Sequence, residues 1–303
     1  MTVALIAGTG GLPPHLASNL MAQGRTPIIC EMRGFQSEIN GEFARVSFRI
    51  ETLGTFLETL RSLNVTEVCM AGAVQRPDVD PSAIDPLTAP LVPRLMAAMA
   101  KGDDGTLREI VTIFEEHGFA SVGAHEVAPD LLPMAGVHTK TVPPDLTREL
   151  VAAQNALTEM GRADQGQAML LRDGAVIAIE DARGTSALLQ DHCASLDPRS
   201  EASDPISLAV ETVSEAVNGA ADWLSGKTDK KPITADGAVL YKAPKPDQLL
   251  VADMPLIGPE TAMQAAEAGL TGIVIPSGTV MVLDLPQVVA ILDAQDMFLW
   301  VSP

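Results

Sequence analysis

The stretch from Met1 to Glu31 places the strongest constraint on the fold. Val3–Ala7 is a short, continuous apolar run, which is typical of a strand buried on both faces of a parallel sheet. A glycine-rich turn follows, then His15–Gln23 with apolar residues at helical spacing, and then a second strand over Thr26–Glu31. This order of strand, turn, helix and strand predicts an N-terminal domain of the Rossmann-like α/β class.

The glycine-rich turn is a candidate anion site. Free N–H groups at the start of a helix attract phosphates, so Gly10, Gly11 and Leu12 are candidate substrate-binding residues. The dinucleotide fingerprint has a third glycine where this chain has Pro13, so the match to a nicotinamide-binding turn is partial. Packing of the strand against the helix explains the same glycines equally well, and both interpretations stay open.

A second candidate site follows a later strand. Leu53–Leu63 is predicted to be an amphipathic helix and Glu67–Ala71 the next strand. Ligands of open α/β sheets gather at the carboxyl ends of the strands, which is where this chain has Gln75 and Arg76. A guanidinium group can hold a phosphate or carboxylate through two hydrogen bonds, and a surface ion pair is the alternative role of Arg76.

Two adjacent acids are candidate metal ligands. They belong to the stretch Lys101-Gly102-Asp103-Asp104, which breaks the helical pattern before it. Carboxylate oxygens suit Mg²⁺, so Asp103 and Asp104 are candidate ligands for this ion. The two acids fit equally well as the N-cap and first-turn residues of a helix predicted over Thr106–His117.

His125 and Glu126 follow a strand predicted over Phe119–Val122. A histidine beside a carboxylate can carry out acid–base chemistry. A hydrogen-bonded structural pair is the alternative explanation of the same two residues.

The second half of the chain predicts a separate mixed α/β domain. Ala128–Pro144 contains four prolines and shows little periodicity, which is typical of a connection between domains. Since single cores stop growing at roughly 250–300 residues, we expect more than one domain in 303 residues. We expect a Rossmann-like domain over residues 1–128, a linker over 129–145 and a C-terminal catalytic α/β domain over 146–303.

The expected elements of the second domain alternate between helices and strands. In chain order they are a helix over Leu146–Met160, a hairpin of Ala168–Arg172 with Ala175–Glu180, a helix capped by Thr185 and Ser186, a helix over Ile206–Leu224, a strand over Ala238–Lys242, a helix over Glu260–Ala268, a hairpin of Gly272–Ile275 with Val280–Leu283, a helix over Gln287–Asp293 and a strand over Phe298–Val301.

Tyr241–Gly258 combines two lysines and an aspartate in one stretch. Prolines flank Lys245, which predicts an extended and stiff backbone. Lys242 and Lys245 could hold a phosphorylated substrate, and Asp253 could bind a metal ion or orient a water. From these residues alone, a surface loop with solvated lysines is the favoured interpretation.

The charge balance bears on partners and location. A net charge of −19 argues against a nucleic-acid ligand, which needs a basic face. The three cysteines Cys30, Cys69 and Cys193 are scattered and lack paired spacing, which is typical of reduced thiols. Because no apolar run reaches the roughly 20 residues of a membrane span, we expect a cytoplasmic protein without a transmembrane segment.

A set of short motifs occurs in a specific order along nearly the whole chain. They are LIAGTGGLP, AGAVQRPD, KGDD, GAHE, GQ before a strand, AIE followed by GT, KAPKP-x-Q, DMPLIG and AGLTGIVI. Each motif alone is common, but their joint order resembles the LpxI-type UDP-2,3-diacylglucosamine pyrophosphatases of lipid A biosynthesis.

The resemblance implies an enzyme and its chemistry. Members hydrolyse the pyrophosphate bond of UDP-2,3-diacylglucosamine to UMP and 2,3-diacylglucosamine 1-phosphate, with water attacking the α-phosphorus. Mg²⁺ or another divalent cation is the implied cofactor. The resemblance also implies a homodimer that contacts the inner membrane transiently to exchange its lipid substrate and product.

The resemblance also assigns site residues by motif. It places the key catalytic aspartate at Asp253, which would either bind the metal or orient the attacking water. Asp103 or Asp104 would then be the second carboxylate at the metal. It implies substrate contacts from Gly10, Gly11, Leu12, Gln75, Arg76, Lys101, Gly102, Asp103, His125, Glu126, Gln167, Thr185, Lys242 and Lys245.

This chain departs from the family pattern at two motif positions. Val251 stands where members carry an arginine two residues before the key aspartate, and Ser186 stands where they carry an aspartate after Gly-Thr. These departures motivate an alternative function, a nucleotide-sugar or lipid-phosphate binding protein with weakened catalysis.

Overall fold

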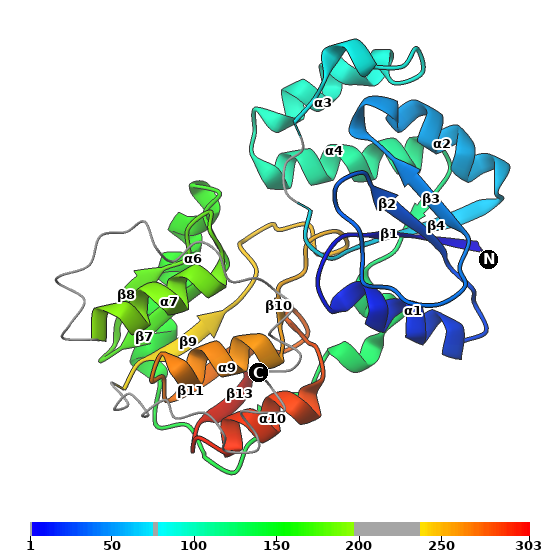
Figure 1. The fold of residues 1–303 in the computed structure, drawn as a ribbon. Helices are drawn as coiled ribbons and strands as arrows, with labels where there is room; N and C mark the ends of the chain where they lie inside the picture. Colours follow the sequence, from blue (N-terminus) through cyan, green and yellow to red (C-terminus); the bar gives the residue numbers. More distant parts are fainter. Residues whose placement is uncertain (1, 75–77, 197–236) are drawn as a thin grey trace. The chain divides into compact units, whose positions relative to one another are not determined.

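The computed structural model describes residues 2–74, 78–196 and 237–303. These residues form two compact units (Figure 1). The first comprises Met1–Asp130 together with Gln248–Met254, and the second comprises Leu131–Asp247 together with Pro255–Pro303. The predicted helix over Ile206–Leu224 and the candidates Gln75 and Arg76 lie outside the described residues.

The first unit is built on a parallel sheet with the strand order β3-β2-β1-β4-β5. Its strands are β1 (Thr2–Ala7), β2 (Ile28–Met32), β3 (Arg45–Phe48), β4 (Val65–Ala71) and β5 (Ala120–Ser121). Its helices are α1 (Leu12–Ala22), α2 (Leu53–Ser62), α3 (Val92–Met99), α4 (Asp103–Glu116) and α5 (Ala124–Val127). The order, with β1 between β2 and β4, is that of a Rossmann half, so the predicted fold class is confirmed.

Aromatic side chains form the core on one face of this sheet. The rings of Phe48 and Phe56 stack with centroids 4.0 Å apart, and Phe114 meets Phe56 edge-on at 6.4 Å. These residues come from β3, α2 and α4, so packing joins the sheet to both helices. Figure 1 shows α1 on the opposite side of the sheet from α2 and α4. Helices on both faces explain why β1 is apolar throughout.

The second unit contains a mixed sheet with the strand order β6-β13-β11-β9-β7-β8. Its strands are β6 (Gly136–Val137), β7 (Ala168–Arg172), β8 (Ala175–Ile179), β9 (Val239–Lys242), β11 (Gly272–Pro276) and β13 (Phe298–Ser302). The central strands β9, β11 and β13 are parallel, whereas β7 runs antiparallel to both of its neighbours and β6 runs antiparallel to β13.

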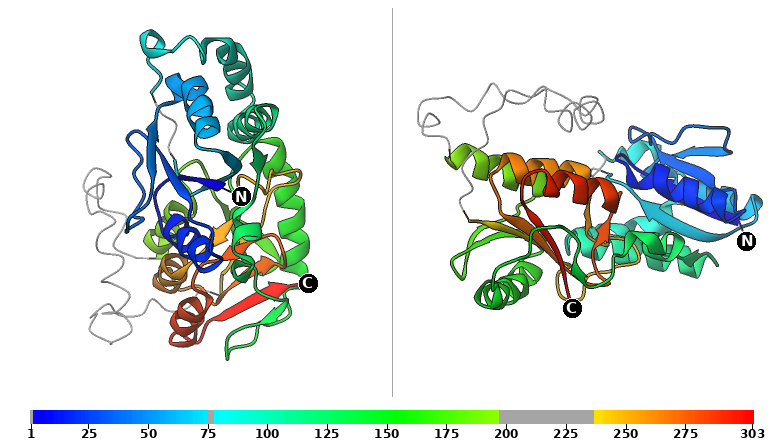
Figure 2. Two further views of the ribbon diagram at one scale, coloured as in Figure 1. Left: turned by 90° about the vertical axis from the view of Figure 1, so that its right-hand side faces the viewer. Right: turned by 90° about the horizontal axis from the view of Figure 1, so that it is seen from below.

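Helices cover both faces of this mixed sheet. They are α6 (Thr147–Arg162), α7 (Thr185–Leu196), α9 (Pro259–Glu267) and α10 (Leu285–Asp293). One core joins α7, α9 and α10 to the sheet around Leu240 and Ile273. A second core on the other face joins α6 to Met169 and Tyr241. Figure 2 shows α6 alone on one side of the sheet and the other three helices on the opposite side, which makes a three-layer α/β/α arrangement.

The predicted hairpin of Gly272–Ile275 with Val280–Leu283 is wrong. β12 (Met281–Val282) instead pairs in parallel with β10 (Leu256–Ile257), outside the main sheet. The physical reason is that β9 and β13 already occupy both edges of β11, so no edge is open to a hairpin partner.

Two short strands and three helix starts also differ from the predictions. Neither β3 nor β6 was predicted from the sequence. β3 alternates polar and apolar residues but is only four residues long, and β6 has only two residues. α1 begins at Leu12 rather than His15, because prolines fit the first turn of a helix. α4 begins at Asp103, and α7 includes Thr185 and Ser186 rather than starting after them.

An ion pair between the buried Glu51 and the partly exposed Arg49 organises the loops beside α2. Glu51, whose side chain is 3% exposed, accepts hydrogen bonds from Arg49 Nη2 at 2.7 Å and from the Asp80 backbone N–H at 2.9 Å. The hydrogen bond from Arg49 is the main cause that lowers the pKa of Glu51 to about 2, against 4.5 for an ordinary glutamate. Ionised Glu51 therefore stabilises the folded state.

We predict that Glu51→Gln lowers the unfolding free energy by on the order of 1–3 kcal/mol at pH 7. Since the folded pKa lies below the unfolded one, this contribution is complete above about pH 5 and is lost as the pH falls towards 2. The difference between wild type and variant should therefore shrink by more than half at pH 3, as measured by calorimetry.

Glu58→Gln is the matched control for this measurement. Glu58 makes an exposed ion pair with Arg61, and such pairs contribute at most about 1 kcal/mol. A Glu51 variant that behaved like this control at both pH values would contradict the assigned role of Glu51.

Candidate functional site

The described site residues predicted from the sequence divide between the two units. In the first unit lie Gly10, Gly11, Leu12, Lys101, Gly102, Asp103, Asp104, His125, Glu126 and Asp253. In the second lie Gln167, Thr185, Lys242 and Lys245. Within each unit the structure brings some of these residues together and keeps others apart.

Asp104 anchors the segment that carries Asp253. It lies in the first turn of α4, after Gly102 as the N-cap residue, where a carboxylate favours the positive end of the helix. Its Oδ1 accepts a hydrogen bond from the Leu249 backbone N–H at 3.2 Å, and its Oδ2 accepts one from Arg108 Nε at 2.6 Å. The first-turn role predicted for the two acids is confirmed for Asp103 and Asp104, and the N-cap role is wrong.

Asp253 is held from its backbone and from its side chain. Its N–H donates to the Leu249 carbonyl at 2.9 Å, which closes a turn over the intervening residues. The side-chain amide of Gln248 donates to the Asp253 carbonyl at 2.6 Å and to its Oδ2 at 2.7 Å. The expectation that Tyr241–Gly258 is extended throughout is therefore wrong, because turns interrupt it at Pro246 and again after Leu249.

Leu249 links two of the three predicted metal-binding residues. Asp104 binds its N–H, and the N–H of Asp253 binds its carbonyl. The structure therefore brings both Asp104 and Asp253 within hydrogen-bond distance of the Leu249 backbone, although 149 positions separate them in the sequence. Within the described ranges, no group of three or more histidine, cysteine, aspartate or glutamate side chains is arranged to hold a metal ion.

A second cluster forms where β7, β8 and β9 of the mixed sheet begin or end side by side. Lys242 ends β9, and its Nζ donates a hydrogen bond to Thr185 Oγ1 at 2.9 Å. The Thr185 hydroxyl donates in turn to Glu180 Oε1 at 2.9 Å, and Glu180 Oε2 accepts the backbone N–H of Gln167 at 2.5 Å. Three predicted site residues thus meet around one carboxylate.

Strand pairing explains why this cluster forms. β7 lies between β8 and β9 and runs antiparallel to both. The start of β7 therefore lies beside the ends of β8 and β9, which brings together Gln167, Glu180 and Lys242. Gly166 allows the close approach, because a Cβ atom there would lie 2.5 Å from the Glu180 carbonyl oxygen. Glu180 and Lys242 are both more than nine-tenths buried. Buried charges need such hydrogen-bonded partners to be stable.

Lys245 lies apart from this cluster. Its Nζ forms an ion pair with Asp164 Oδ1 at 2.5 Å, and its side chain is only 12% exposed. Asp164 adopts a left-handed backbone with φ +48°, just after α6. The lysine predicted to be solvated is therefore held against a carboxylate.

The glycine turn after β1 is tied to the loop after β4. The backbones of Thr9 and Ala73 exchange two hydrogen bonds of 3.0 Å, and a Cβ atom at Gly8 would lie 2.4 Å from the Ala73 carbonyl oxygen. Strand-to-loop packing therefore requires Gly8. Gly11 is the N-cap of α1 and has no side chain that could cap the first N–H groups of the helix. Anion binding at Gly10, Gly11 and Leu12 stays a hypothesis.

His125 occupies a helical turn rather than a strand end. It lies in α5, with Nε2 3.9 Å from Glu126 Oε1, which is too long for a hydrogen bond. Its Nδ1 is buried and has no hydrogen-bond partner among the described residues. The alternative of a hydrogen-bonded His125–Glu126 pair is therefore wrong.

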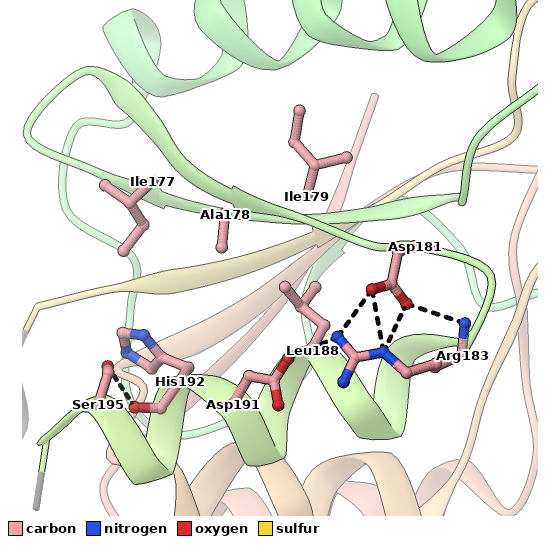
Figure 3. Close-up of a pocket in the computed structure, with 9 residues that line it drawn as sticks. All are labelled: Ile177, Ala178, Ile179, Asp181, Arg183, Leu188, Asp191, His192 and Ser195. Carbon is pink, nitrogen blue, oxygen red and sulfur yellow. Dashed lines mark hydrogen bonds and ion pairs between the residues drawn. The ribbon is translucent and has the colours of Figure 1, made fainter. Parts of the chain in front are cut away.

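A pocket of about 280 Å³ lies between β8 and α7 (Figure 3). Among its lining residues, Arg183 bonds Asp181 and Asp191, each at 2.7 Å, and its hydrogen bond lowers the pKa of Asp181. Two carboxylates against one guanidinium leave this pocket with a negative balance, which disfavours an anionic ligand. The predicted site residues do not line the pocket.

Glu180 and Gln248 were not predicted as site residues. Glu180 is the glutamate of the motif AIE, and Gln248 is the glutamine of KAPKP-x-Q, so the motifs could have indicated both as site residues. What the sequence did not reveal is which partners they bind, because those partners depend on strand pairing and on the turn after Leu249.

Comparisons with known proteins cover nearly the whole chain. Residues 2–131 match the family model of the LpxI N-terminal domain, and residues 134–300 match that of the LpxI C-terminal domain. The chain is 33% identical over 297 residues to the UDP-2,3-diacylglucosamine pyrophosphatase LpxI of Caulobacter vibrioides, covering 98% of this chain and 95% of the relative. Together with the ordered motifs, these matches show that the chain belongs to the LpxI family.

Proposed function

We propose that this protein hydrolyses the pyrophosphate bond of UDP-2,3-diacylglucosamine to UMP and 2,3-diacylglucosamine 1-phosphate in lipid A biosynthesis. The observation that carries the proposal is the full-length match to the Caulobacter vibrioides enzyme of that name. The two hydrogen-bonded clusters around Asp253 and Glu180 support it, because hydrolysis of a phosphoanhydride needs a carboxylate and cations in fixed positions.

Asp253 supplies the carboxylate in this proposal. The hydrogen bonds from Gln248 and the closure onto Leu249 restrict its orientation. A carboxylate held in this way can accept a hydrogen bond from the attacking water and direct it at phosphorus. Asp253 therefore orients the nucleophile in the proposed reaction.

Lys242 supplies positive charge for the diphosphate. Thr185 and Glu180 fix its ammonium group, so it loses little side-chain entropy when it binds an anion. A hydrogen-bonded lysine of this kind stabilises charge that grows on the phosphate oxygens as the bond breaks.

A divalent cation fits the donor chemistry beside Leu249. Mg²⁺ is commonly held by one or two carboxylates, with waters and substrate phosphates completing its shell, so it does not require three protein ligands. Asp253 and Asp104, which both bind Leu249, would hold it. When bound, the cation would neutralise charge on the pyrophosphate.

The chemistry of the substrate suggests where the enzyme works. A nucleotide-linked, doubly acylated sugar combines a water-soluble head with two chains that prefer a bilayer. We propose that the protein acts in the cytoplasm as a homodimer and contacts the membrane transiently. In the described residues, no helix combines the length and the apolar character that crossing a bilayer requires.

We predict that Asp253→Asn lowers the rate of UMP release by about 10³-fold or more, because the amide cannot accept a proton from water. Asp247→Asn is the control, since Asp247 is exposed and its backbone at φ +63° suits asparagine as well as aspartate. Purified protein, a defined lipid substrate and chromatographic detection of UMP give the measurement.

Other outcomes of the same assay are equally informative. Full activity of Asp253→Asn would remove Asp253 from the mechanism, and tight lipid binding without turnover in wild type would favour the binding-protein alternative. Hydrolysis in ¹⁸O-labelled water identifies the phosphorus attacked. Attack at the α-phosphorus places the label in UMP, whereas label in the sugar phosphate would place the attack at the β-phosphorus.

We predict that Thr185→Val raises KM and lowers kcat/KM by about 10- to 100-fold, because it disconnects Lys242 from Glu180. Thr185→Ser keeps the hydroxyl and should retain kcat/KM within about threefold. The measurement is steady-state kinetics of both variants, with melting temperatures to show that each is folded. Equal kcat/KM for the two variants would contradict the role of the hydroxyl.

We predict that chelation of divalent cations abolishes UMP release and that added Mg²⁺ restores it. The expectation follows from the acidic surroundings of the proposed site, which attract a cation and repel a diphosphate. Titration of the chelated protein with Mg²⁺ and with Ca²⁺ provides the measurement. Undiminished activity in excess chelator would rule out the proposed metal dependence.

A further inference from the structure

Gln248 has a position in the fold that a surface loop residue would not have. It is the first residue of the stretch Gln248–Met254 that belongs to the first unit, and its side chain is 9% exposed. A buried side-chain amide must be hydrogen-bonded to be tolerated, so its partners indicate what it does.

The amide nitrogen of Gln248 bonds two atoms of Asp253. Nε2 donates to Asp253 Oδ2 at 2.7 Å and to the Asp253 carbonyl at 2.6 Å. The two hydrogens of one NH₂ group therefore connect the backbone and the carboxylate of the same residue. Such a pair of bonds restricts the side-chain torsions of Asp253, because the carboxylate cannot turn away without breaking the bond to Oδ2.

Two backbone hydrogen bonds of Leu249 fix the position of the loop that carries Gln248 and Asp253. The N–H of Leu249 is bound by Asp104 on α4, and its carbonyl accepts the N–H of Asp253. The loop is thus attached to a helix at one point and closed on itself at another. Gln248 then sets the direction of the carboxylate relative to α4.

A neutral donor also preserves the chemical character of the carboxylate. A lysine or arginine at this position would form an ion pair and offset the charge of Asp253, which the proposed reaction needs for a water or a cation. An amide orients the same group through hydrogen bonds without adding a charge.

We propose that Gln248 is a positioning residue, which holds the Asp253 carboxylate in the orientation required for hydrolysis. This role rests on the proposed function. Gln248 acts through Asp253 and need not touch the substrate. Its contribution is geometric, and misplacing a reacting group by about 1 Å costs on the order of 10²-fold in rate.

The test is Gln248→Met, which keeps the length and packing of the side chain but removes both donors. We expect kcat for UMP release to fall by about 10- to 100-fold, while KM stays within about threefold and the melting temperature within a few degrees. Gln248→Glu, which keeps the shape but replaces the NH₂ group with an acceptor, should lower kcat at least as much.

Gln23→Met is the matched control. Gln23 lies in the same unit and also donates a side-chain amide bond, but to the Val127 carbonyl, at 2.8 Å. Its loss should leave kcat and KM unchanged, so the control separates loss of an amide bond from loss of this particular one.

Each remaining result overturns the inference. Unchanged kcat in Gln248→Met, with an active wild type, would remove Gln248 from the mechanism and leave the proposed function standing. A fall in kcat that follows the fraction of unfolded protein would assign Gln248 a purely structural role. Absence of UMP release from wild type would instead overturn the proposed function, and the role of Gln248 with it.

Discussion

Asp104 and Asp253 come together because both bind the backbone of Leu249. One carboxylate at the start of α4 accepts its N–H, and the N–H of the other aspartate reaches its carbonyl. These bonds attach Gln248–Met254 to the first unit, although the residues on either side belong to the second. A carboxylate on a free loop would sample many orientations, whereas the loop that carries Asp253 is bonded to α4 and an amide restricts the direction of its carboxylate. The chemistry proposed for this protein depends on that restriction.

Charge is balanced locally in a chain with a net charge of −19. The ammonium group of Lys242 reaches Glu180 through Thr185, and that of Lys245 is paired with Asp164. Both lysines are thereby fixed in position, but a part of their positive charge is already offset. A diphosphate would need further neutralisation, which is a physical reason to expect a divalent cation at the acidic cluster beside Leu249.

Hydrophobic pattern predicted the elements whose burial is regular. The apolar run of β1, the alternation of helices and strands, and the hairpin of β7 with β8 all follow from local periodicity. The exceptions are informative. β12 pairs with β10 because both neighbouring positions of β11 are occupied by β9 and β13. β3 is a four-residue edge strand, and its alternating pattern is too short to stand out until its pairing with β2 is known. In each case the missing information was the identity of a distant neighbour.

The sequence by itself determined the family and the residue types at the site. Ordered motifs along nearly the whole chain pointed to Asp253, Thr185 and Lys242, and the family models match both halves. Only the tertiary structure decided how these residues are held, with Glu180 joining Thr185 to Gln167 and Gln248 turning Asp253. Motif order records which side chains are present, but a hydrogen bond needs two atoms within about 3 Å in a suitable direction. That proximity arises from strand pairing and from the attachment of a loop to α4. Both join residues that are far apart in the sequence, so local sequence patterns do not predict them.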